Sequence, residues 1–251
     1  MNLKSYLKRI NYHKDLVLNK ALLFELQQCH LKNVPFENLD IHYNRVIELD
    51  LTAIYNKIVE HKRGGFCYEL NGLFYSLLKE IGFDVWMVSG RVYNGKGGYG
   101  QEYDHLALMV ALDGDHYLVD VGFGKFSSQP LRINFEEELL DDVGCFKFDR
   151  LDENYWRVNE VIEGELVPQY IFSPQKRALQ EFQEMCTFHQ SSPASHFTQK
   201  RVVSLPTKEG RITLNDQQFK ITKQGVTETI AIKNEAQFEA VLMDQFAIKI
   251  I

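Results

Sequence analysis

The chain has 251 residues, of which 45% are hydrophobic and 25% are charged, and its formal net charge at pH 7 is −6. A chain of this length can bury a substantial hydrophobic core, either as one large domain or as two. Its charges are interspersed and acidic in balance, so no basic stripe is available to neutralise a nucleic-acid backbone. The composition therefore indicates a globular protein that does not bind nucleic acid.

The sequence also argues against membrane insertion, secretion and metal binding. No run approaches the roughly 18 apolar residues that a membrane span needs, and the charged start of the chain is unlike a signal peptide. We therefore expect a cytoplasmic protein that does not enter a membrane. The cysteines, Cys29, Cys67, Cys145 and Cys186, lack C-x-x-C spacing, and the histidines other than His105 have no spacing typical of metal ligands. The sequence predicts reduced thiols, no metal site, and surface or structural roles for those histidines.

The first 85 residues are predicted to be mainly helical. An amphipathic run over 16–29 predicts one helix, and Pro35 should break the helical course soon after it. A second helix is predicted by apolar residues that recur on one helical face, with Gly82 as its stop. These apolar residues are Phe66, Leu70, Leu73, Phe74, Leu77, Leu78 and Ile81.

From residue 85 to about residue 190, the pattern changes to short β-rich segments separated by glycine or charged turns. The predicted strands cover 85–92, 103–110, 117–121, 155–162 and 167–172. Beyond residue 191, strands are predicted at 201–205, 210–214 and 218–221, followed by a helix at 235–246. No internal repeat, low-complexity segment or Pro/Ser-rich linker divides the chain into independent units.

Cys67 is the most informative residue, because it lies at the first turn of the second predicted helix. The start of a helix carries unsatisfied N–H groups and a partial positive charge, which favour a thiolate over a thiol. The same N–H groups can bind an oxyanion. The position of Cys67 therefore predicts a cysteine nucleophile.

A base for this nucleophile is predicted in a hairpin. Asp113 and Gly114 are typical of a two-residue turn, which would set His105 opposite Gly122 and residue 107 opposite Asp120. His105 and Asp120 would then be diagonal neighbours on one face, roughly 7–8 Å apart at the backbone, a gap that their side chains can close. A three-residue loop would change this register, and the sequence leaves that alternative open.

Cys67, His105 and Asp120 follow one another in the chain as nucleophile, base and orienting carboxylate. Each residue has a structural alternative. A single cysteine is most often a small buried hydrophobe, a histidine in a strand is often a hydrogen-bonded structural residue, and an aspartate can simply shape a turn. Their joint setting, at a helix start and on one hairpin face, favours a catalytic triad.

Three segments carry a resemblance to a known family. RGGFCYELN at 63–71, DHL at 104–106 and VDVGFG at 119–124 resemble the signature segments of the arylamine N-acetyltransferases. The segments at 34–39, 192–198 and 210–214 are similar to further parts of that family, so the likeness covers nearly the whole chain. The length and spacing are those of bacterial members.

The resemblance implies a two-step acyl transfer with acetyl-coenzyme A as co-substrate. Acetyl-coenzyme A would acetylate Cys67, and an aromatic amine or hydrazine would then remove the acetyl group. His105 would be imidazolium beside the thiolate in the first step and would accept a proton from the amine in the second, while Asp120 would hold the ring tautomer. A thioester suits this exchange because the acyl-enzyme remains activated toward nitrogen.

The resemblance also implies the residues around the triad. Phe36 and Phe123 should line the acceptor site, and an aromatic wall suits the stacking of a flat arylamine. Arg63 and Glu37 should form a supporting ion pair. For the phosphates of coenzyme A, the best local candidates are the residues around Gly124 and Lys125, although a plain turn explains the same residues. A second glycine-rich run, at 95–100, is interpreted as a mobile loop.

The implied fold is α+β, with three parts around a papain-like Cys-His-Asp core. A helical N-terminal bundle would cover 1–85, a β-barrel-like domain 86–190, and an α/β lid 191–251. The nucleophile would come from the bundle and its two partners from the barrel. Catalysis would therefore depend on how these two parts dock.

Other functions remain open from the sequence alone. An amide synthase of the same superfamily, or a papain-like hydrolase or transglutaminase, would use the same three residue types on other acyl groups. A coenzyme A or arylamine binding protein with an unreactive thiol is the non-enzymatic alternative. The sequence does not determine the physiological amine or the oligomeric state.

Overall fold

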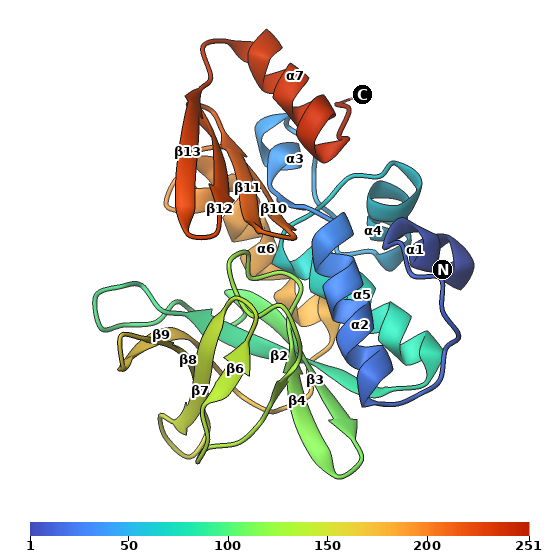
Figure 1. Cartoon of the computed structure of the whole chain (residues 1–251), viewed down its shortest axis with the longest axis vertical. Coiled ribbons are helices and arrows are strands. Elements are labelled where there is room, and N and C mark those ends of the chain that lie inside the picture. The colour runs from blue at the N-terminus through green and yellow to red at the C-terminus, as the bar shows by residue number, and fades with distance from the viewer. Residues whose placement is uncertain (251) are drawn as a thin grey trace.

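The computed structural model describes residues 1–250, and it has the predicted α+β architecture. Helices of the N-terminal half pack beside an eight-stranded antiparallel sheet, and a five-stranded sheet with one helix lies above both (Figure 1). The apolar core follows the same division. One large cluster lies between the N-terminal helices and the hairpin strands, a second lies inside the eight-stranded sheet, and a third lies under the C-terminal helix.

The first 85 residues are mainly helical, as predicted. The elements are α1 (Leu3–Arg9), α2 (Lys20–Asn33), α3 (Leu39–His42), α4 (Leu51–Tyr55), a π-helical turn (Asn56–Glu60) and α5 (Cys67–Ile81). The helix predicted at 16–29 is shifted, because Asn19 caps α2 by accepting the N–H of Leu22 at 2.9 Å. It continues to Asn33, just before Pro35.

The eight-stranded sheet forms a nearly closed barrel with the order β5-β4-β3-β2-β9-β8-β7-β6. Its strands are β2 (Asp84–Val92), β3 (His105–Leu112), β4 (Asp115–Val119), β5 (Leu131–Arg132), β6 (Leu139–Asp141), β7 (Gly144–Arg150), β8 (Trp156–Ile162) and β9 (Glu165–Phe172). The β-rich pattern predicted up to about residue 190 ends early. The chain is helical in a 3₁₀ turn (Leu179–Phe182) and in α6 (Gln183–Ser191), which pack on the N-terminal core through buried side chains such as Phe182.

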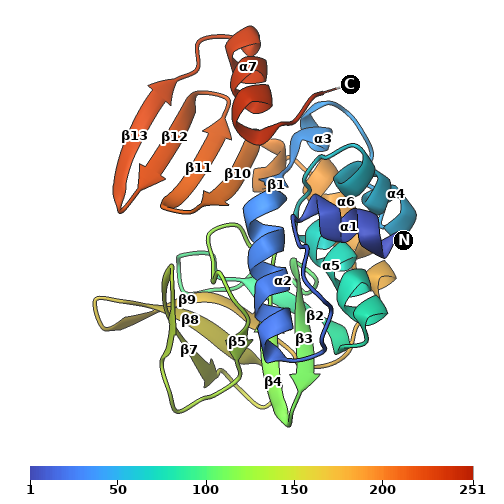
Figure 2. The same ribbon diagram turned by 45° about the vertical axis from the view of Figure 1, so that its right-hand side comes forward.

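The five-stranded sheet has the order β1-β10-β11-β12-β13. Its strands are β1 (Phe36–Glu37), β10 (Val202–Thr207), β11 (Gly210–Asn215), β12 (Gln218–Lys223) and β13 (Val226–Ala231), and α7 (Glu235–Phe246) covers it (Figure 2). The short strand β1 was not predicted, and it joins the N-terminal half to the C-terminal sheet by pairing with β10. The division into 1–85, 86–190 and 191–251 stays a prediction.

The hairpin that carries His105 has the predicted register. Asp113 and Gly114 both have positive φ, 54° and 85°, as a type I′ turn requires. Leu108 pairs with Val119 across the strands, which is the predicted two-residue-loop register. Strand β4 ends at Val119, so Asp120 lies one residue beyond the ladder.

Helix α5 is the central element of the N-terminal half. Its apolar face is buried, with Phe74 and Leu77 fully covered, and it contacts both β2 and β3. It stops at Gly82, whose φ of 110° is readily adopted only by glycine. The predicted helix is confirmed in its start, its face and its end.

No helix among residues 1–250 combines the length and the apolar character needed to cross a membrane.

We expect Phe74→Ala to lower the free energy of unfolding by about 3–5 kcal/mol, because it removes a fully buried ring from a close-packed core. Urea denaturation followed by circular dichroism would measure the change. Glu80→Ala, at an exposed position of the same helix, is the control and should stay within about 0.5 kcal/mol of wild type. Equal stabilities of the two variants would contradict this packing.

Candidate active site

Cys67 is the first residue of α5 and is 3% exposed. The turn before it is fixed by Glu69, whose carboxylate accepts the backbone N–H of Phe66 at 3.2 Å. This bond satisfies a backbone donor at the helix start. The sulfur thus lies at the positive end of the helix dipole.

The structure brings the three predicted residues together. His105 Nε2 lies 2.7 Å from Asp120 Oδ2, and Cys67 lies near the His105 ring in the wall of one pocket and contributes to raising the pKa of that ring. Both His105 and Asp120 are 2% exposed. Because Nε2 faces the carboxylate, it carries the proton in the neutral ring, and Nδ1 is left for the sulfur.

Four donors surround the Asp120 carboxylate. Oδ2 accepts from His105 and from the hydroxyl of Tyr170 at 3.0 Å. Oδ1 accepts from the Asn71 amide at 2.9 Å and from the backbone N–H of Gly122 at 2.8 Å. A buried carboxylate with four donors is held in its ionised form and in one orientation.

The electrostatics of the pair follow from this arrangement. Burial alone would lower the pKa of His105, but the charge and hydrogen bond of Asp120, together with Cys67, outweigh it and raise that pKa to about 10. Burial alone would raise the pKa of Asp120, and the His105 charge with the surrounding donors lowers it below its usual value. At neutral pH the pair is therefore imidazolium and carboxylate.

Asn71 was missed by the sequence analysis, although it lies in the RGGFCYELN segment. Its amide nitrogen also donates to the Leu106 carbonyl at 2.6 Å, and its oxygen accepts the N–H of Val121 at 2.9 Å. One side chain of α5 thus binds strand β3, the segment that follows β4, and the Asp120 carboxylate. A polar residue one turn after Cys67 on the buried face of a helix was the available signal.

Cys67 and His105 open into a pocket of about 340 Å³. Phe36 and Phe123, predicted to line the acceptor site, both lie in its wall together with Phe197. The ring centroid of Phe123 is 5.1 Å from that of His105, and those of Phe36 and Phe197 are 6.2 Å apart. The pocket is therefore walled by aromatic rings beside the triad.

Two histidines that the sequence predicted to be surface or structural residues also line this pocket. His189 is 2% exposed, with Nε2 3.1 Å from Asp104 Oδ1 and Nδ1 3.1 Å from Ser195 Oγ. His196 is exposed at the rim, and its pKa is lowered by partial burial and by His189. Both lie at least 70 residues after the end of the hairpin at Val119, so only the tertiary fold brings them to the site.

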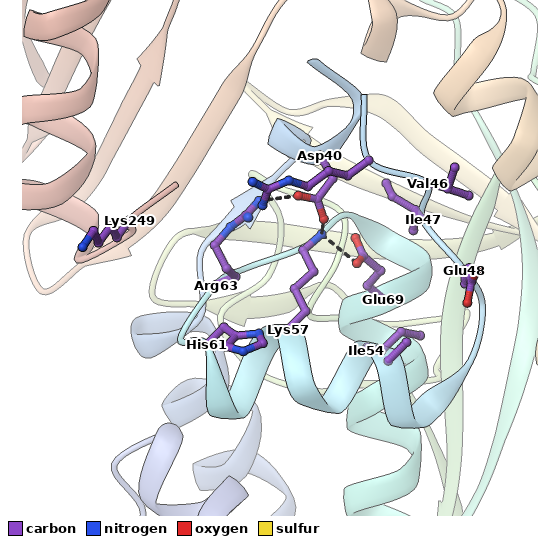
Figure 3. Close-up of a pocket in the computed structure, with 12 residues that line it drawn as sticks. Asp40, Val46, Ile47, Glu48, Ile54, Lys57, His61, Arg63, Glu69 and Lys249 are labelled. Atoms are coloured by element: carbon purple, nitrogen blue, oxygen red, sulfur yellow. Dashed lines mark hydrogen bonds and ion pairs between the residues drawn. The ribbon is translucent and has the colours of Figure 1, made fainter. Parts of the chain in front are cut away.

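A buried ionic cluster supports the start of α5 from the other side (Figure 3). The predicted pair is present, with Arg63 2.8 Å from Glu37, but Arg63 also binds Asp40 at 2.9 Å. Lys57 in turn lies 2.7 Å from both Asp40 and Glu69. These five side chains connect the segments on both sides of Cys67.

The cluster borders a second pocket of about 350 Å³ that does not contain the triad. Burial raises the pKa of Asp40, but the charges of Lys57 and Arg63 outweigh it and lower the pKa overall. Burial raises the pKa of Glu69, which Lys57 offsets in part. The two cations of the cluster offset most of the charge of its three carboxyl groups, and we interpret the cluster as a support for the helix start.

The two residues predicted to meet coenzyme A follow Phe123 directly. Gly124 has φ of 92°, and no atom lies within 4 Å of where a side chain would begin. The side chain of Lys125 is 74% exposed and lies 3.8 Å from Glu160. Their part in binding stays a prediction.

Within residues 1–250, no cluster of three or more histidine, cysteine, aspartate and glutamate side chains could hold a metal ion, and the four cysteines are free.

A cysteine at a helix start, near a histidine–aspartate pair and an aromatic-walled pocket, is the arrangement typical of thiol-dependent enzymes. The family model of the N-acetyltransferases matches residues 21–251. The chain is 31% identical to the liver isozyme of arylamine N-acetyltransferase from Gallus gallus, covering 99% of this chain and 96% of that protein. It belongs to the arylamine N-acetyltransferase family and is an acyltransferase.

Solved structures agree with this assignment. The arylamine N-acetyltransferase of Salmonella typhimurium superposes with a TM-score of 0.92 at 28% identity, covering 98% of this chain and 90% of that one. The Mycobacterium marinum enzyme, solved in complex with CoA, superposes with a TM-score of 0.88 at 30% identity, covering 98% of this chain and 93% of that one. The predicted fold class and family are confirmed.

Gly122→Ala should lower the rate of acetyl transfer at least about tenfold, because the new methyl group would lie 2.7 Å from the Cys67 Cα. The backbone of α5 would have to move away from the hairpin. Single-turnover acetylation of Cys67 would measure the effect. Gly164→Ala, at an open turn in the barrel, is a control for added strain at a glycine. An unchanged rate in Gly122→Ala would contradict the close docking.

The His105 ring should titrate near pH 10 in wild type and below its ordinary midpoint of about 6.5 in Asp120→Asn, because burial then acts without the carboxylate. Imidazole ¹⁵N NMR against pH would measure both midpoints.

Because the pKa of His105 is raised on folding, the contribution of this histidine to the stability of the fold is complete below about pH 6.5 and is lost as pH rises through about 10. Midpoints near 6.5 in both proteins would contradict the buried ion pair.

Proposed function

We propose that the protein transfers the acetyl group of acetyl-coenzyme A to the nitrogen of arylamines and arylhydrazines by double displacement through an acetyl-Cys67 intermediate. The observation that carries this proposal is the contact of Cys67, His105 and Asp120 at one end of an aromatic-walled pocket. Family membership supports the donor and the acceptor class.

In the first step, the Cys67 sulfur attacks the thioester carbonyl. With the pKa of His105 raised to about 10, its ring is protonated at neutral pH and stabilises a thiolate beside it. The new sulfur–carbon bond forms as the bond to the coenzyme A sulfur breaks, and the leaving thiolate takes the proton from His105. The N–H groups at the start of α5 stabilise the negative carbonyl oxygen between these events.

In the second step, the acceptor nitrogen attacks the acetyl-Cys67 carbonyl. Acetylation removes the sulfur contribution that raises the pKa of His105, so that pKa falls and Nδ1 can accept a proton from the amine. The nitrogen–carbon bond forms, the sulfur leaves as thiolate, and the amide product departs. Asp120 holds the ring orientation through both steps and stabilises the imidazolium.

The pocket walls support the acceptor class. Phe36 and Phe123 offer aromatic faces for a flat amine or hydrazine, and Phe123 also packs against His105, so a stacked ring would lie beside the base. For the donor, the open backbone at Gly124 and the exposed Lys125 are the proposed contacts for coenzyme A. In this proposal, residues 1–85 supply the nucleophile and residues 86–190 supply the base. Residues 191–251 form a lid.

Acetyl-coenzyme A should add about 42 Da to the wild-type protein, the mass of one acetyl group replacing a hydrogen, and an aniline or hydrazine should remove it. Cys67→Ala should form no adduct and should lose turnover, because no other cysteine contacts the His105 ring. Intact-mass spectrometry measures both. Cys29→Ala, a half-buried thiol outside the site, is the matched control and should behave as wild type.

Other outcomes of the same measurement would replace the proposal. Retained turnover in Cys67→Ala would exclude Cys67 as the nucleophile. An adduct from longer acyl donors but not from acetyl-coenzyme A would indicate an amide synthase, and rapid discharge by water alone would indicate a hydrolase. Coenzyme A binding without any adduct would indicate a binding protein.

A further inference from the structure

Arg211 lies where the C-terminal sheet meets the loop that follows Asp120. Its side chain extends from β11 and is half-buried. Nη2 donates to the Gly124 carbonyl at 2.8 Å, and Nη1 donates to Ser204 Oγ at 2.8 Å. One guanidinium therefore joins the sheet to the loop that carries Phe123.

The charge of Arg211 has no carboxylate partner among the described residues. Burial, the only cause that acts on its pKa, lowers that pKa to about 10. Arg201 on the same sheet shows the contrast, because it lies 2.5 Å from Asp216 and 2.6 Å from Glu235. A half-buried cation without a counter-charge is costly, and most such groups are paired.

Arg9 is also half-buried and has no carboxylate partner within residues 1–250, but its hydrogen bonds account for its charge. Its guanidinium donates to four backbone carbonyls, those of Ile58, Asn33, Lys62 and Arg63. Arg211 has the same five N–H donors and uses them on only two oxygens. Of these two guanidinium groups, Arg211 therefore keeps donors for a further acceptor.

This guanidinium binds two residues that are neighbours of pocket-lining residues. Gly124 follows Phe123, and Ser204 is paired across the sheet with Phe36, so both contacts of Arg211 adjoin a pocket wall. The space beside Gly124 is open, since no atom lies within 4 Å of where a side chain would begin. A ligand reaching Cys67 along this loop would pass the guanidinium.

We propose that Arg211 binds a phosphate group of coenzyme A, the acyl donor. This inference rests on the proposed function and adds a binding residue to it. A phosphate would supply the missing counter-charge, and the planar guanidinium fork fits phosphate oxygens. The net charge of −6 gives no general attraction for a polyanion, so the donor must be held by local cations of this kind.

The test compares two acyl donors that carry the same acetyl thioester and differ in their phosphates. Acetyl-coenzyme A carries the phosphates, and acetyl-pantetheine carries none. In Arg211→Gln, the second-order rate of Cys67 acetylation by acetyl-coenzyme A should fall by about ten- to a hundredfold, the usual effect of losing a hydrogen bond to a charged group. The rate with acetyl-pantetheine should stay near wild type. Equal losses with both donors would show a purely structural role and overturn the proposal.

Direct binding gives a readout that is independent of turnover. Calorimetric titration with coenzyme A should give a higher Kd for Arg211→Gln and a weaker dependence of Kd on salt, because one phosphate contact is gone. Acetyl-dephospho-coenzyme A would show whether the contact is to the 3′-phosphate or to the pyrophosphate. An unchanged Kd and salt dependence would overturn the proposal.

Two further variants complete the design. Arg201→Gln removes a guanidinium of the same sheet that is already neutralised, so the preference for acetyl-coenzyme A over acetyl-pantetheine should remain. Arg211→Lys keeps a positive charge and should retain part of that preference; if Arg211→Gln does not fold, the lysine variant decides the question. Absence of any acetyl-Cys67 in wild type would refute the proposed function, whereas normal acetylation with an unaltered donor preference would refute only the role of Arg211.

Discussion

The docking of the α5 N-terminus against the β3–β4 hairpin is the contact on which the site depends. Asn71 makes it with one side chain, binding Leu106, Val121 and Asp120. Gly122 permits it, because any larger residue would meet the Cys67 backbone. Cys67 comes from a helix and His105 from a strand, so no local structure could hold them close together. Packing at this junction therefore sets both the stability of the fold and the geometry of the triad.

Buried charge on both sides of this junction is compensated locally. On the pocket side, four donors hold the Asp120 carboxylate, and its charge keeps His105 protonated despite burial. On the other side, the ionic cluster holds Arg63 and Glu69, which bracket Cys67 in the chain. Removing one partner from such a set leaves an uncompensated charge, which costs more than the pair contributes. The start of α5 is thereby fixed in position while its sulfur remains free to react.

The pocket beside Cys67 and His105 is built from segments far apart in the chain. Phe36 belongs to the N-terminal half but lies in the C-terminal sheet through β1, while Phe123 follows the hairpin. His189 and Phe197 come from the helical segments after the barrel. The C-terminal sheet therefore contacts the site directly. Arg211 makes one of these contacts, because it binds the loop residue Gly124. Acceptor choice and donor binding can then be adjusted by residues far from Cys67 in sequence.

The sequence by itself determined the elements whose signals are local. The apolar periodicity of 66–81, with Gly82 after it, predicted helix α5. The turn residues Asp113 and Gly114 predicted the register of the hairpin. Both signals are local, because backbone geometry and side-chain period act over a few residues. Family segments then connected Cys67, His105 and Asp120. Only the tertiary structure decided that Asn71 bridges helix and hairpin, that His189 lines the pocket, and that Arg211 lies beside Gly124 without a counter-charge. These facts arise from contacts between residues far apart in the chain, 35 positions for Asn71 and Leu106 and 87 positions for Arg211 and Gly124, for which no local propensity exists.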